Sequence, residues 1–336
     1  MASDKLHVLQ SFRGIAASMV VVHHALNSLL YYHPIRSSFL LFLCHLGKYG
    51  VDFFFVLSGF ILTYAFAQKK QNSVPWHRFI LARFIRVYVP FLPISIALYF
   101  FYTYYPHFSN GSRDLSLWTS LTLFPSGKPS LSVAWTLSHE ILFYLLFSVM
   151  YIGEKYWKIL CTLWVIGIGM GYVVFHESTK NTFFGFVFSP YNVEFLVGYG
   201  TAKFYLQGKS IAKEIYLALL VLIFSLIVFL LWNQWYPVRF FTNFLVAIMS
   251  ALLILKFINS TWTPPRILLF SGMISYSIYL IHNPVQIFIV RLLPEIHSLI
   301  LVFIVLLLIL FVVHLMAWIY YQIFENSVTN KIKKRV

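Results

Sequence analysis

Residues 298–321 read SLILVFIVLLLILFVVHLMAWIYY, and no aspartate, glutamate, lysine or arginine interrupts them. A helix needs about 20 apolar residues to cross the hydrocarbon core of a bilayer, so this stretch has the length of one span. Similar apolar runs recur along the chain, near 14–32, 47–66, 86–105, 134–152, 157–175, 183–205, 214–233, 239–258, 267–291 and 298–321. Only helices and closed barrels satisfy the backbone in lipid, and these runs lack the alternation of barrel strands. The sequence therefore predicts an all-α polytopic integral membrane protein with about ten transmembrane helices.

The composition supports this interpretation. Of 336 residues, 60% are hydrophobic, 20% are aromatic and only 10% are charged, whereas a soluble domain carries roughly 25% charged residues. So few charges cannot form the polar coat of a soluble globule of this length. We expect one membrane domain over residues 1–336 with a basic tail at 325–336, and no separate soluble domain.

The basic residues predict the orientation in the membrane. With both termini inside, the cytoplasmic segments contain Lys5, Arg13, Lys69, Lys70, Arg78, Arg83, Arg86, Lys155, Lys158, Lys203, Lys209, Lys213, Lys256, Arg266, Lys331, Lys333, Lys334 and Arg335. The outer segments then contain Arg36, Lys48, Arg113, Lys128, Lys180, Arg239 and Arg291. This bias follows the positive-inside rule and favours cytoplasmic termini. The net charge of +15 is thus a topology signal, and we expect no nucleic-acid partner.

Two polar residues share a face of the first span. His24 follows Arg13 by eleven residues, which is a rotation of about 1100° and within about 20° of three full turns. The rise between them is about 16 Å, while His23 is rotated by about 80° from that face. Ionisable residues inside a membrane are costly and usually mark a functional site or a buried pair. Cys44 and Cys161 lie in separate apolar runs without ligand spacing, so we expect no metal site.

Four further residues are ionisable groups within predicted spans: Asp52, Glu140, Glu194 and His282. Asp52 begins the second span, where a carboxylate also suits the positive end of a helix dipole. Glu140 is either a site residue or one half of a buried ion pair, and His282 either takes part in chemistry or is a plain hydrogen-bonding group.

Three arginines, Arg78, Arg83 and Arg86, lie between the second and third spans. Arginine forks suit phosphate groups, although long basic side chains also serve as anchors at the inner interface. The topology thus predicts a cationic inner layer and an outer layer with His24, Asp52, Glu140 and His282. Such an arrangement suits a reaction across the membrane, in which an anionic donor docks inside and a histidine acts as base for an external acceptor.

The outer connection at about 106–130 is rich in turn residues, with Asn110-Gly111-Ser112 and a Pro-Ser-Gly-Lys-Pro run at 125–129. It either lines an external substrate cleft or is a plain connector.

Five motifs carry a resemblance to a known family. They are Ser11-Phe12-Arg13-Gly14-Ile15-Ala16-Ala17 with His24, GVDFFFVLSGF at 50–60, RFIRVYVP at 83–90, WTLSHE at 135–140 with Phe143 and Tyr144, and SYSIYLIH at 275–282. In this order and at these intervals they resemble the membrane acyltransferase-3 family, integral membrane enzymes that O-acylate sugars of bacterial surface polysaccharides. The resemblance covers nearly the whole chain.

The resemblance implies transfer of an acetyl or other short acyl group from cytoplasmic acyl-CoA to a sugar hydroxyl of a surface polysaccharide or its lipid-linked precursor. It implies location in the bacterial cytoplasmic membrane, with acyl-CoA, a glycan acceptor and membrane lipid as partners and no bound cofactor. By analogy His24 is the leading catalytic residue, Glu140 supports the active centre, and Arg13, Arg83 and Arg86 contact coenzyme A. Some family members carry a C-terminal hydrolase-like domain, and because this chain ends shortly after Glu325 we expect a stand-alone member.

Other interpretations stay open at this point. No serine or cysteine lies in a nucleophile motif such as GxSxG, so direct attack by the acceptor is the default and a covalent intermediate is the alternative. A transporter or flippase for a lipid-linked saccharide also explains ionisable residues in spans, but it does not explain the five motifs. A receptor without turnover has no soluble signalling module to support it.

Overall fold

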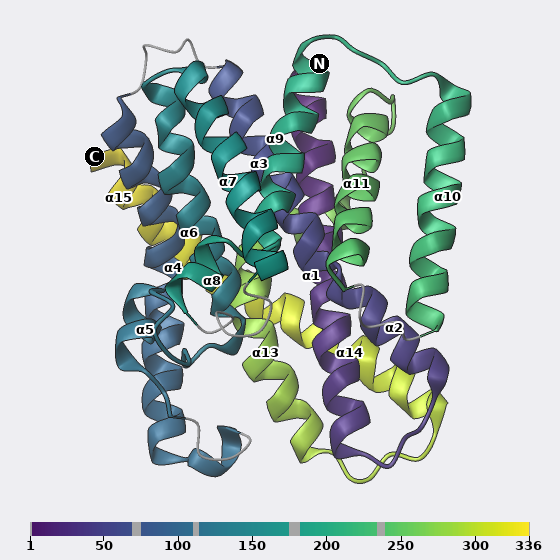
Figure 1. Cartoon of the computed structure of the whole chain (residues 1–336). Coiled ribbons are helices and arrows are strands. Elements are labelled where there is room, and N and C mark those ends of the chain that lie inside the picture. Colours follow the sequence, from purple (N-terminus) through teal and green to yellow (C-terminus); the bar gives the residue numbers. More distant parts are fainter. Residues whose placement is uncertain (1, 69–74, 110–113, 175–181, 234–238, 336) are drawn as a thin grey trace. The chain divides into compact units, whose positions relative to one another are not determined.

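A computed structural model describes residues 2–68, 75–109, 114–174, 182–233 and 239–335. Within these ranges every regular element is a helix (Figure 1). The only extended pairing within them is a single bridge between Leu115 and Lys128. The expected all-α fold class is confirmed. Lys69, Lys70, Arg113, Lys180 and the Asn110-Gly111-Ser112 turn lie outside the described residues.

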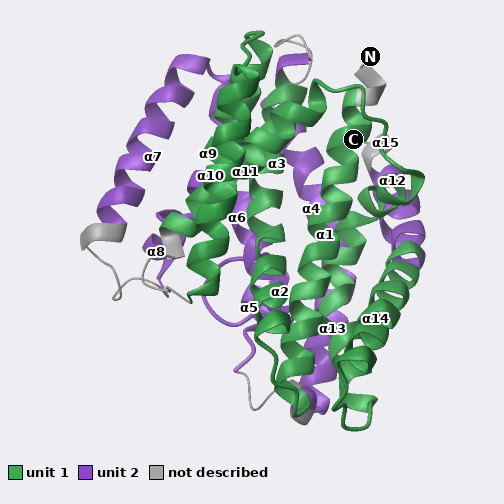
Figure 2. Ribbon diagram, turned by 90° about the vertical axis from the view of Figure 1, so that its right-hand side faces the viewer, with its two compact units in different colours: residues 1–66, 194–318 green, residues 67–193, 319–336 purple. Residues whose placement is uncertain are grey.

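The chain divides into two compact units, residues 1–66 with 194–318 and residues 67–193 with 319–336 (Figure 2). The first unit is formed mainly by α1 (Ala2–Tyr32), α2 (Ser38–Lys48), α3 (Gly50–Gln68), α9 (Tyr191–Leu206), α10 (Lys213–Trp232), α11 (Arg239–Ile258), α12 (Arg266–Met273), α13 (Ser275–Leu292) and α14 (Leu299–Tyr320). The second is formed by α4 (Trp76–Tyr104), η1 (Pro106–Ser109), α5 (Leu117–Thr122), η2 (Ser132–Ala134), α6 (Trp135–Phe147), η3 (Ser148–Tyr151), α7 (Glu154–Val174), α8 (Phe183–Val187), η5 (Tyr321–Thr329) and α15 (Asn330–Arg335).

Seven helical segments of the described chain are long and apolar enough to cross a membrane, and an eighth results if the bent pair α12–α13 is one span. The seven are Lys5–Tyr32, Ser38–Gln68, Trp76–Tyr104, Ser132–Tyr151, Lys213–Trp232, Phe241–Ile258 and Leu299–Ile332. Large apolar side chains such as Leu307 and Phe311 are about two-thirds exposed, as expected of surfaces that face lipid rather than water. The chain is thus an integral membrane protein by its helices.

Two of the ten predicted spans are not among these segments. The described part of the predicted span at 157–175, residues 157–174, belongs to α7, and residues 183–205 fold as the short α8 followed by α9. Pro190 stands between α8 and α9, where its missing N–H and fixed φ end one helix and start another. The count of ten and the cytoplasmic termini stay predictions.

Several helices begin earlier than the apolar runs suggest. Helix α1 starts at Ala2 and α4 starts at Trp76, so Arg13, Arg83 and Arg86 lie well inside helices instead of at their ends. The reason is that basic side chains end an apolar run in the sequence but do not end a helix, since arginine is a good helix former.

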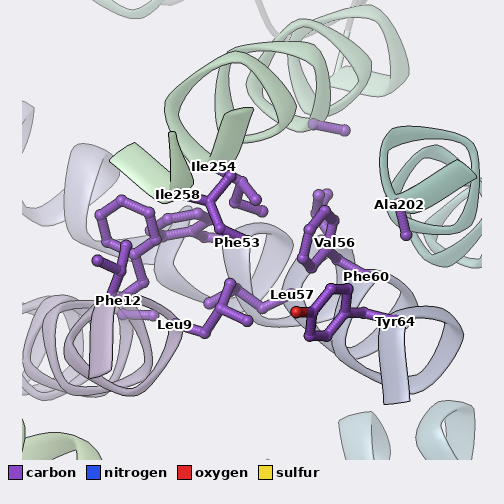
Figure 3. Packing of buried hydrophobic residues seen from close by; sticks show 13 residues of the cluster. Leu9, Phe12, Phe53, Val56, Leu57, Phe60, Tyr64, Ala202, Ile254 and Ile258 are labelled. Atoms are coloured by element: carbon purple, nitrogen blue, oxygen red, sulfur yellow. The ribbon is translucent and has the colours of Figure 1, made fainter. Parts of the chain in front are cut away.

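The core of the first unit combines α1, α3, α9 and α11. Phe12 of α1 lies 5.4 Å from Phe53 and 5.5 Å from Phe257 between ring centroids. Figure 3 shows Phe12 and Leu9 facing Phe53, with Ile254 and Ile258 of α11 beside them. In lipid, contacts between apolar side chains gain van der Waals energy but no hydrophobic free energy, because lipid tails are as apolar as the side chains. Close fit between the helices therefore decides which of them associate.

The second unit has an aromatic core of its own. The rings of Phe147 and Trp157 lie 5.3 Å apart, and Phe79 of α4 contacts Phe147 at 6.1 Å. Buried hydroxyls fix the connection to α6: Ser95 Oγ donates to the Ser120 carbonyl oxygen at 2.6 Å and contacts Ser130 Oγ at 3.0 Å. The described part of the 106–130 segment is thus tied to α4.

Candidate active site

Helix α1 places two adjacent histidines beside α2. Nδ1 of His23 lies 2.7 Å from the Cys44 carbonyl oxygen. Its ring centroid lies 4.8 Å from that of His24, in an edge-to-face arrangement. Helical periodicity placed His23 about 80° away from the helix face of Arg13 and His24. In the structure the His23 ring nevertheless contacts the His24 ring, so the two histidines form one cluster.

His24 is half-buried, and its Nδ1 lies 3.0 Å from the carbonyl oxygen of Val20, one turn earlier. A carbonyl oxygen only accepts hydrogen bonds, so Nδ1 carries the hydrogen. In the neutral ring Nε2 then holds the lone pair. This hydrogen bond presents His24 as a proton acceptor through Nε2.

His282 of α13 lies directly against His24, with 5.0 Å between ring centroids. It is fully buried, and its Nδ1 contacts the carbonyl oxygens of Tyr279 at 2.7 Å and Ile278 at 3.1 Å. Its Nε2 has no hydrogen-bond partner among the described residues. The structure thus brings together two predicted site residues that are 258 positions apart in the sequence.

The approach of α13 to α1 depends on a break in the predicted span at 267–291. Helices α12 and α13 are bent by 75°. A Cβ on Gly14 would lie 2.7 Å from the Gly272 nitrogen, and a Cβ on Gly272 would collide with the Gln10 carbonyl oxygen. The Gln10 amide donates to the Leu269 carbonyl oxygen at 3.1 Å, which stabilises the end of α12. Arg13 is the neighbour of Gly14 in the sequence, so it lies at the height along α1 where α12 ends and α13 begins.

Asp52 is buried and lies against Glu194 at the start of α9. The sequence marked both residues as ionisable groups in a span, but it gave no reason to pair them. The structure therefore assigns Asp52 a carboxyl neighbour within the first unit.

Glu140 belongs to the second unit, together with the arginines of α4. The hydroxyl of Tyr144 donates to Glu140 Oε1. The Arg83 guanidinium carbon lies 5.6 Å from the centre of the Tyr144 ring and 5.5 Å from that of Phe79. Arg86 also interacts electrostatically with Tyr144.

This cluster differs from the expected two layers. The sequence argument put Glu140 in the outer layer and Arg83 in the inner one, but both contact Tyr144. The physical reason is that α4 starts at Trp76, so Arg83 lies two turns inside the helix. The spacing of Glu140 and Tyr144, one turn apart on α6, was readable from the sequence and is confirmed.

A family model described as an acyltransferase domain matches residues 6–321. The chain belongs to the acyltransferase 3 family. No curated protein and no solved structure matches it.

As a member of this family the protein is a membrane acyltransferase, an enzyme that takes its acyl group from a donor. The acyltransferase contains three groupings of the candidate residues: His24 with His282, Asp52 with Glu194, and Glu140 with Arg83 and Arg86. Within the described residues, no group of three or more His, Cys, Asp or Glu side chains is arranged to hold a metal ion.

Proposed function

We propose that the protein is a membrane O-acyltransferase that moves an acetyl or other short acyl group from cytoplasmic acyl-CoA to a sugar hydroxyl. The acceptor is a bacterial surface polysaccharide or its lipid-linked precursor, and the enzyme lies in the cytoplasmic membrane. The observation that supports this most is the His24 imidazole, whose Nδ1 hydrogen bond to Val20 leaves Nε2 as a proton acceptor. Acyl transfer to a hydroxyl needs a base of this kind near neutral pH.

In this scheme the acceptor hydroxyl transfers its proton to Nε2 of His24 while its oxygen bonds to the thioester carbonyl carbon. The carbon–sulfur bond then breaks, and coenzyme A leaves as a thiolate. The His24 imidazolium returns the proton to this sulfur. The proton and both electron pairs balance without a further reactant.

The other candidate residues act around this step. His282 packs edge to face on His24 and holds its ring in place. Asp52 is a buried acid of the same unit and favours the imidazolium through the low-dielectric interior. Arg13, Arg83 and Arg86 bind the phosphates of coenzyme A, because guanidinium forks match phosphate oxygens. Glu140 positions Arg83 through the Tyr144 hydroxyl and ring.

The test is acetyl transfer in proteoliposomes, with radiolabelled acetyl-CoA and surface glycan extracted from cells that lack the protein. His24→Ala should lower transfer by about 10²- to 10⁴-fold, the usual contribution of a general base. His314→Ala is the matched control, since Nδ1 of His314 also contacts the carbonyl oxygen one turn earlier, Leu310, at 2.7 Å.

A folded His24→Ala protein with near-normal transfer would contradict the assigned role. Mass spectrometry of surface glycans with and without the protein identifies the acyl group and the sugar. If glycan export stops while the ester content of the remaining glycan is unchanged, the protein is a transporter instead.

A further inference from the structure

Apart from the histidine cluster, the first unit buries two carboxyl groups at one place. Asp52 of α3 is 1% exposed and Glu194 of α9 is 2% exposed. Glu194 contacts Asp52 and the side chain of Asn243 from α11, and Lys48 of α2 interacts with it electrostatically. Three helices and the end of a fourth thus face this point.

The packing of α3 on α9 makes this contact unavoidable. The rings of Phe55 and Phe195 stack with 4.5 Å between centroids. The helices then cross at Gly59 and Gly198, where a Cβ on either glycine would collide with the opposite backbone. Such close approach through small residues is typical of helices that associate in membranes.

The two helices run in the same direction. They start with Asp52 and Glu194, and they end with the rings of Tyr64 and Tyr205, 6.0 Å apart. Figure 3 shows Val56, Phe60 and Tyr64 following one another along α3 on the side of Ala202. Asp52 lies one turn before Val56 in the same stripe, so its side chain belongs to the helix interface.

Among the groups described around Glu194, the charges do not balance. Two adjacent buried carboxyl groups cannot both stay ionised without a large cost, and Lys48 supplies one positive charge nearby. One more positive charge is needed for a neutral site.

Asn243 is an independent sign of a ligand. It is 6% exposed and contacts Glu194, yet its Oδ1 has no hydrogen-bond partner among the described residues. A buried amide oxygen without a donor is costly, and it is also a ligand that small hard cations prefer.

We propose that Asp52, Glu194 and Asn243 form a binding site for one monovalent cation, a proton or a sodium ion, in the core between α3, α9 and α11. The bound cation completes the charge balance with Lys48 and holds the three helices together. Asp52 also has a role in the proposed acyl transfer at His24, but the cation site is tested by unfolding, which needs neither donor nor acceptor.

The test measures thermal unfolding of the purified full-length protein in detergent from pH 5 to pH 9, in sodium chloride and in choline chloride. If the folded state holds one proton that the unfolded state releases, raising the pH shifts the folded-to-unfolded ratio towards the unfolded state about tenfold per pH unit. If the site takes sodium, the unfolding temperature at pH 9 is higher in sodium chloride than in choline chloride. Both effects arise only when the native state binds the cation better than the unfolded state.

Glu194→Gln keeps the size of the side chain and removes one negative charge, so it should abolish the dependence on proton or sodium. Glu214→Gln is the control, because Glu214 is an exposed acid in the first turn of α10. Asn243→Ala removes the side-chain amide, both the oxygen proposed as a sodium ligand and the NH2 group, and leaves both carboxyl groups in place. It should weaken the sodium effect and leave the one-proton slope unchanged.

Identical pH and sodium dependence in the wild type and Glu194→Gln would overturn the proposal. Lys48 and the nearby His45 are ionisable groups as well, so only the difference between these two proteins counts. If Glu194→Gln does not fold, the proposal is tested on the wild-type protein by infrared spectroscopy, which detects the carbonyl band of a protonated carboxylic acid. Its presence at pH 7 in choline supports a proton, its replacement on adding sodium supports exchange, and its absence in choline at every pH overturns the site.

Discussion

Replacing Tyr144 with phenylalanine removes one hydroxyl from the second unit and leaves the ring that Arg83 contacts. That hydroxyl donates to Glu140 Oε1, Tyr144 is buried and Glu140 is half-buried. A hydrogen bond to a charged group contributes about 1.5–3 kcal/mol. We therefore expect Tyr144→Phe to lower the free energy of unfolding by about that amount. Glu140→Gln should weaken the same bond, because it removes the charge.

A double-mutant cycle isolates the interaction. The free energies of unfolding of Tyr144→Phe, Glu140→Gln and the double variant are measured in one detergent, with Tyr156→Phe as the control because Tyr156 is exposed on α7. The double variant should lose less than the sum of the single losses, by about 1.5–3 kcal/mol. If Glu140 positions Arg83, both single variants should also raise the KM for acyl-CoA more than they change kcat. A coupling below about 0.5 kcal/mol with an unchanged donor KM would refute this reasoning, because distant and independent sites add within that margin.

Three further predictions concern other parts of the molecule. Gly59→Leu should destabilise the protein by about 1–3 kcal/mol or more through overpacking. Gly200→Leu should leave thermal unfolding unchanged, because a Cβ added at the exposed Gly200 meets nothing within 4 Å. His282→Gln should lower kcat by less than His24→Ala does, and it should shift the pH dependence of kcat. An unchanged pH dependence would mean that His282 only packs against His24. Arg83→Lys should raise the KM for acyl-CoA despite keeping the charge, because an ammonium group lacks the planar fork of a guanidinium. An unchanged KM in steady-state kinetics would mean that Arg83 does not bind the donor and only anchors its helix at the inner interface.

The sequence predicted interactions within one helix well. The eleven-residue step from Arg13 to His24 stays on one continuous helix, and Glu140 and Tyr144 meet one turn apart. Both follow from the fixed geometry of the α-helix. The family assignment also followed from local motifs, since the family model covers the same stretches.

Interactions between helices were not predictable in the same way. Nothing in the sequence paired Asp52 with Glu194. The apolar run at 267–291 predicts one span but gives no sign of the 75° bend between α12 and α13. The close approach of α12 to α1 needs Gly272, which looks like any glycine in an apolar run until the backbone of α1 lies against it.

The sequence by itself thus determined the membrane environment, the all-α fold class and the family of this acyltransferase, because apolar length, helical periodicity and short motifs are local properties. Only the tertiary structure decided that His24 meets His282 and that Asp52 meets Glu194. In water an apolar stripe marks the face of a helix that packs inward. In lipid every face is apolar, so the pairing of helices depends on close fit between small residues and buried polar groups.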